Sequence, residues 1–157
     1  MLLQFSRQLL DFEPSGQGYN VFVKFGVGEN SYTLPYSGGR YDLGRLYTCP
    51  FVTETLSGNV NGFCIFTTKD DADMYASELL ERWLDHVRFV ETTIWKYNNL
   101  MQPTYFVKPV EYDEAKVIGT LRIGNEPHKS SYMRFALCVI AGKMKITNKF
   151  KWVLPEV

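Results

Sequence analysis

The most regular pattern of apolar positions lies after Thr68 and predicts one long amphipathic helix. Apolar residues recur at spacings of three and four, at Ala72, Ala76, Leu79, Trp83, Val87, Val90, Ile94 and Tyr97. This spacing places them on one stripe of a helix. The helix is predicted at about residues 69–97. The β-branched and aromatic residues 87–97 fit equally well a strand that follows a shorter helix.

The start and the outer face of this helix carry a polar signature of their own. Thr68 and Asp71 have the spacing of a capping box, in which side chains satisfy backbone donors at a helix start. Glu78 and Arg82 lie four residues apart, which places opposite charges together on a helix surface. These features support a helix that begins near Lys69.

Shorter apolar runs on both sides of the helix predict strands. Residues 19–26 and 30–34 read as a hairpin, and residues 60–66 as a buried strand. Further strands are predicted at 105–110, at 117–123, at 131–141 and within 143–153, with 105–110 at a sheet edge because it contains Pro109. Residues 2–12 fit a short helix or an edge strand, and residues 36–59 match no single element.

Together these elements predict an α+β fold, with an antiparallel or mixed β-sheet packed against the long helix. The length of 157 residues and the 45% of apolar residues suit one globular domain over residues 1–157. No stretch has the length and apolarity of a membrane span or the composition of a signal peptide, so a membrane partner is not expected.

Charge and cysteine content narrow the classes of function. The formal net charge is zero, which does not favour a general affinity for nucleic acid or anionic membranes. Cys49, Cys64 and Cys138 are odd in number and lack the CxxC spacing of a zinc site, so neither a disulfide framework nor a bound metal is expected. A reducing, cytoplasmic setting is the simplest interpretation, with Cys49 as the exposed thiol and no charged neighbour in sequence to activate it.

The C-terminal stretch contains an alternating series of lysines that could bind anions. If residues 146–148 form a hairpin loop, Lys145 lies opposite Lys149, Lys143 lies opposite Lys151, and all four lysines share one face. Such a face suits phosphates or nucleic acid. The alternative is that these lysines only keep a sheet face or edge soluble.

The Tyr- and Gly-rich stretch from Tyr32 to Phe51 is the other candidate surface. Tyrosine and arginine are enriched where proteins bind each other, which makes protein-binding candidates of Tyr36, Arg40, Tyr41, Arg45 and Tyr47. The alternative is that the aromatic rings anchor a long connection onto the core.

Catalytic chemistry finds little support in the sequence. His128 lies in a polar loop and is the one enzyme candidate, while Glu111, Asp113 and Glu114 read as a solvated turn. The G-x-G pairs lead into strands rather than into helices, so they do not predict a phosphate loop. No catalytic residue and no cofactor are assigned, and an enzyme is the less favoured class.

The function expected from these observations is that of a small protein-interaction module, such as an inhibitor or accessory factor, with another protein as its partner. Nucleic-acid or phosphate binding by the C-terminal lysines is the alternative, and an enzyme with a site near His128 is the second alternative. A viral or mobile-element source is a background expectation for compact, aromatic-rich chains without a familiar motif. The oligomeric state is not predicted.

Overall fold

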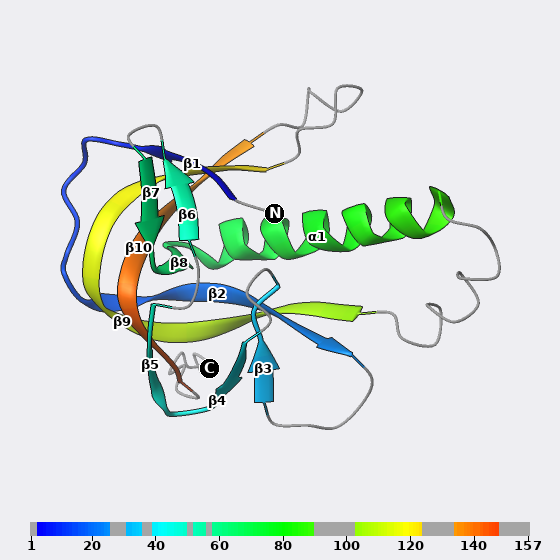
Figure 1. The fold of residues 1–157 in the computed structure, drawn as a ribbon, viewed down its shortest axis with the longest axis horizontal. Helices are drawn as coiled ribbons and strands as arrows, with labels where there is room; N and C mark the ends of the chain where they lie inside the picture. The colour runs from blue at the N-terminus through cyan, green and yellow to red at the C-terminus, as the bar shows by residue number, and fades with distance from the viewer. Residues whose placement is uncertain are drawn as a thin grey trace, which may run out of the picture.

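The computed structural model describes residues 3–25, 31–35, 39–49, 52–55, 58–89, 103–123 and 134–147. Within these ranges lie ten strands and one helix, and the strands pair mostly antiparallel (Figure 1). The predicted α+β class is therefore confirmed.

The elements follow one another along the chain with a single helix after the eighth strand. In order they are β1 (Leu3–Arg7), β2 (Gly16–Phe25), β3 (Ser31–Thr33), β4 (Arg40–Asp42), β5 (Leu46–Thr48), β6 (Val52–Thr55), β7 (Gly58–Asn61), β8 (Phe63–Phe66), α1 (Lys69–Phe89), β9 (Pro103–Ile123) and β10 (Arg134–Ile146). The predicted hairpin of β2 with β3 is confirmed. The buried strand predicted at residues 60–66 is confirmed for 63–66 as β8, but residues 60 and 61 belong to β7, which pairs with β6.

Four of the strands form a closed circuit. β2 pairs with β9, β9 with β10, β10 with β8, and β8 again with β2. β9 makes this closure possible because it is long and strongly bent, so that its first part follows β2 and its second part follows β10 and β1 (Figure 1). β3 and β4 extend the sheet beyond β2, and β6 and β7 extend it beyond β1, where β1 and β6 run parallel.

A β-bulge lies where β9 bends. Ile140 and Ala141 are neighbours in β10, but their partners in β9 are Val117 and Ala115, so Lys116 is an extra residue. An extra residue bends a strand without ending its ladder. The sequence prediction of two strands, at 105–110 and 117–123, joined by a solvated turn is therefore wrong, because the acidic residues between them belong to one continuous strand.

Pro109 lies where β10 ends. The Thr147 N–H donates to the Pro109 carbonyl at 3.1 Å, and the last register pair of the two strands joins Val110 with Ile146. Proline lacks an N–H, so the hydrogen bond lost at this position is one at the end of the β9–β10 ladder. Among the described residues, 103–109 otherwise pair only with β2, so this part of β9 has a neighbour on one side, as the predicted edge position requires. The rest of β9 pairs with β10 on one side and with β2 or β1 along parts of the other.

The helix begins as the sequence predicts. The Asp71 N–H donates to Thr68 Oγ1 at 3.2 Å, and Arg82 Nε donates to Glu78 Oε2 at 2.9 Å. The helix extends to Phe89, so helix rather than strand is confirmed for residues 87–89. Residues 90–97, the remainder of the predicted range, lie outside the described residues.

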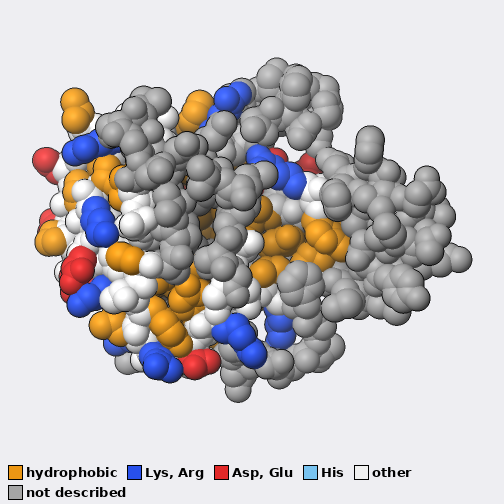
Figure 2. All heavy atoms as spheres, viewed as in Figure 1, with side chains coloured by type: hydrophobic (Ala, Val, Ile, Leu, Met, Phe, Trp, Pro, Cys, Tyr) orange, Lys and Arg blue, Asp and Glu red, His pale blue; other side chains and the backbone are white. Residues whose placement is uncertain are grey.

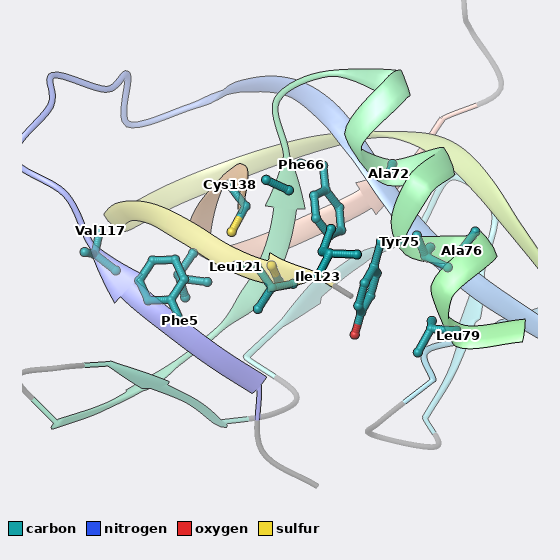
Figure 3. Close-up of a cluster of buried hydrophobic side chains, with 14 residues drawn as sticks. Phe5, Phe66, Ala72, Tyr75, Ala76, Leu79, Val117, Leu121, Ile123 and Cys138 are labelled. Carbon is teal, nitrogen blue, oxygen red and sulfur yellow. The ribbon is translucent and has the colours of Figure 1, made fainter. Parts of the chain in front are cut away.

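Two hydrophobic clusters occupy opposite faces of the sheet. The first lies under α1, where Tyr75 faces Phe66 of β8 with 5.3 Å between the ring centroids, and Leu79 lies one turn further along the helix (Figure 3). The second lies on the other face and contains Phe22 and Met144. Neighbouring strand residues point to opposite faces, so a strand that feeds both clusters is apolar at consecutive positions. This explains the uninterrupted apolar run of β8.

Candidate functional site

The Tyr- and Gly-rich stretch from Tyr32 to Phe51, here called the Tyr/Arg stretch, is described at residues 32–35 and 39–49, and there Tyr41 anchors it on the core. Tyr41 is only 5% exposed, and its ring packs edge-on against Tyr47 at 4.8 Å and against Phe63 at 5.9 Å between centroids. This burial leaves little of the Tyr41 ring for a partner, because the ring lies within the second cluster, so it does not favour Tyr41 as a binding residue. The alternative of an anchored connection is the one that fits Tyr41.

The other candidates of this stretch differ in their exposure to solvent. The Tyr47 hydroxyl accepts the Asp42 N–H at 2.8 Å, and the Arg45 guanidinium lies 5.5 Å from the centre of the Tyr47 ring. Arg40 and Arg45 are exposed and Tyr47 is half-buried. Tyr36 lies outside the described residues. The tyrosines described here mainly support the fold, and Arg45 packs over one of them.

The predicted lysine hairpin does not form with the proposed register. Lys143 and Lys145 lie in β10, where β9 flanks them on one side and β5 on the other. A strand residue has two neighbours in a sheet, so no place beside Lys145 is left for Lys149. Lys149 and Lys151 themselves lie outside the described residues.

The two described lysines are paired with carboxylates. Lys143 Nζ lies 3.0 Å from Glu114 Oε2, and Lys145 Nζ lies 3.5 Å from Glu111 Oε1. The hydrogen bond to Glu114 raises the pKa of Lys143 above its usual value. Glu111 lies opposite Lys145. Lys143, in contrast, lies opposite Asp113 and reaches the next residue, Glu114. These carboxylates offset the positive charge that an anion would need.

The cysteines divide as the sequence predicts. Cys64 and Cys138 are buried, and burial, followed by the neighbouring Cys64, raises the pKa of the Cys138 thiol. Cys49 is exposed, and Lys116 Nζ lies 3.5 Å from its sulfur. The sequence did not indicate this neighbour because the two residues are 67 positions apart.

Two further classes of site are a catalytic histidine and a metal centre. His128 lies outside the described residues, and so does the side chain of His86. In the ranges that the structure describes, no group of three or more His, Cys, Asp or Glu side chains could hold a metal ion. No helix there combines the length and apolarity needed to cross a membrane.

The segment between β1 and β2 is a connection that is held to β9 by its backbone. It is irregular from Gln8 to Ser15, and it is tied to β9 at both ends. The Gln8 N–H donates to the Ile118 carbonyl, and the Ala115 N–H donates to the Pro14 carbonyl, each at 2.9 Å. β1 and β2 pair with different parts of β9, and the segment between them passes outside the bend of β9 (Figure 1).

Large apolar side chains of this segment point into solvent. Leu9 is 96% exposed, Leu10 52% and Phe12 38%. Among the described residues, the other exposed large apolar side chains are scattered over β10, β5 and the turn before β5, at Phe135, Leu46 and Leu43. Single exposed leucines are ordinary, whereas a contiguous group indicates a contact surface. We refer to Leu9–Phe12 as the apolar segment.

Acidic residues alternate with the end of the apolar segment. Asp11 and Glu13 are both exposed. Burial, followed by the negative charge of Glu13, raises the pKa of Tyr112. Hydrophobic, acidic and basic side chains all lie along the left margin, where the β1–β2 connection runs (Figure 1 and Figure 2).

The apolar segment was missed in the sequence because its residues 2–12 fit a helix or an edge strand, both of which would bury leucines. The signal that could have revealed it is the pair Asp11 and Glu13 set among apolar residues just before Pro14 and Gly16. No protein-family model, no curated protein and no solved structure matches this chain. The function must therefore be argued from the surfaces themselves.

Proposed function

We propose that this protein is a protein-interaction module that binds another protein through the apolar segment. The observation that carries the proposal is the exposure of Leu9, Leu10 and Phe12 on a connection that is tied to β9 at both ends. A role as an inhibitor or accessory factor belongs to the same class. The three free thiols support a reducing, cytoplasmic setting for this interaction.

The energetics favour this surface over the others. Full burial of one leucine side chain stabilises a complex by about 2 kcal/mol, and Leu9 is almost wholly available for such burial. The two backbone hydrogen bonds at Gln8 and Pro14 restrict the segment before binding, so less conformational entropy is lost when a partner orders it.

Anion binding by the C-terminal lysines is the weaker proposal. Lys143 and Lys145 already face carboxylates, and an anion would have to displace them. The Tyr/Arg stretch is also weaker, because Tyr41 contributes its ring to the core.

A pull-down with matched variants tests the proposal. The tagged chain is compared with Leu9→Ser/Leu10→Ser, and the control Leu43→Ser/Leu46→Ser removes two exposed leucines elsewhere. We expect a stoichiometric protein that the wild-type chain and the control retain, that survives nuclease, and that the segment variant loses. Equal retention by all three chains, or loss on nuclease treatment, would contradict the proposal.

A further inference from the structure

We propose that the partner receives the apolar segment in an apolar groove whose rim carries lysine or arginine side chains. This inference rests on the proposed function and adds the shape and charge of the surface that the segment fits. The shape is inferred from the length and course of the segment, and the charge from the acidic residues beside its apolar side chains.

The shape follows from the two attachment points on β9. Ile118 and Ala115 are three residues apart, so they are separated by at most about 10 Å along an extended strand. Gln8 and Pro14 are six residues apart, a length of chain that can span about 20 Å. The connection therefore has more length than the gap requires, and it runs outside the bend of β9 (Figure 1). An exposed apolar connection on the outside of the fold is complementary to a concave surface.

The charge follows from the residues that alternate with the apolar ones. Asp11 and Glu13 alternate with Leu10, Phe12 and Pro14 and are exposed. The nearest base in sequence, the exposed Arg7, lies in β1 before the segment. Burial of Leu10 and Phe12 in a groove would bring these carboxylates to its rim. Basic rim residues would pair with them, whereas acidic rim residues would be repelled.

The same charges argue against three other occupants. In a symmetric dimer formed by two apolar segments, the Asp11 and Glu13 side chains of both copies would meet, and like charges oppose such a contact. Anionic lipid surfaces and nucleic-acid phosphates would likewise repel the two carboxylates. A protein with a basic rim is the occupant that both the apolar and the acidic residues fit.

Association kinetics of the full chain with the protein retained in the pull-down test this inference. The variants are Asp11→Asn/Glu13→Gln, which removes two charges, and Asp11→Lys/Glu13→Lys, which reverses them. The control Asp42→Asn/Glu81→Gln changes the net charge by the same amount as the neutralising variant, but on β4 and α1. At low salt we expect association rate constants about 3-fold lower for neutralisation and about 10-fold or more lower for reversal, with the control near wild type. High salt should remove most of these differences because it screens the charges.

The outcomes separate the inference from the proposed function. If retention depends on Leu9 and Leu10 but the rate constants do not depend on Asp11 and Glu13, the groove with a basic rim is wrong and the interaction module stands. If sedimentation shows instead that the retained protein is a second copy of the chain, both proposals are overturned, because each names a protein other than this chain as the partner. If no protein is retained in a manner that depends on the leucines, both proposals are overturned.

Discussion

Removal of the two leucines of the apolar segment should leave the domain folded. Leu9 is 96% exposed, so Leu9→Ser gives up almost no buried surface, whereas Leu10 is 52% exposed and gives up about half. With about 2 kcal/mol for a fully buried leucine, the double variant should lose about 1 kcal/mol of unfolding free energy. By contrast, Leu121→Ala, at a residue only 1% exposed, should lose about 2–5 kcal/mol because it leaves a cavity.

Urea denaturation followed by circular dichroism measures both variants. We expect the Leu9→Ser/Leu10→Ser midpoint to shift slightly while the dependence on urea concentration stays unchanged, because the surface exposed on unfolding is nearly the same. A loss above about 2 kcal/mol for the double variant would mean that the segment packs against the sheet in solution. In that case the surface proposed for binding would not be available, and the reasoning would fail.

Three further predictions test the fold around this surface. Gly18→Ala should cost about 1–3 kcal/mol in urea denaturation, because the new Cβ would lie 2.5 Å from Ile65 Cγ2 where β2 meets β8, and an unchanged midpoint would contradict this close approach. Thr68→Ala should cost about 1 kcal/mol because the Asp71 N–H loses its acceptor, and Thr68→Ser should recover most of it. Because the folded state raises the pKa of Cys138, the unfolded state loses this proton first as the pH rises, so stability should fall above about pH 9.0 by up to about 1.4 kcal/mol per pH unit. A Cys138→Ala variant should lack that component, and identical pH profiles for the two chains would refute the assignment.

Local patterns in the sequence predicted the elements whose partners lie nearby. The spacing of apolar residues and the Thr68 cap located the start of α1, and the alternation of residues 19–26 located β2. These signals are local because a helix stripe, a cap and a strand face each depend on residues a few positions apart.

The features that were missed depend on pairing between distant residues. β5 occupies the flank of Lys143 and Lys145 that the predicted hairpin required, and nothing in the sequence near residue 145 indicates this partner. Tyr41 resembles an interface residue by type, and only the fold brings Phe63 against it. The bulge at Lys116 likewise became visible only through the register of β9 with β10.

For the apolar segment, the sequence predicts burial where the structure shows exposure. Leu9 and Leu10 would be buried in almost any regular element, so their sequence neighbourhood predicts a core contribution. They are exposed because β1 and β2 pair with separate parts of β9 and leave a connection longer than the gap it spans. Exposure is therefore a consequence of topology.

Hydroxyl-radical footprinting of the complex with the retained partner tests the central claim most directly. The rate of side-chain oxidation is measured by mass spectrometry for the free chain and for the complex. We expect oxidation of Leu9, Leu10 and Phe12 to slow strongly in the complex, while Leu43 and Leu46 react at the same rate in both. If Leu9 stays as reactive as in the free chain, and protection appears instead on the Tyr/Arg stretch or along β10, the apolar segment is not the binding surface.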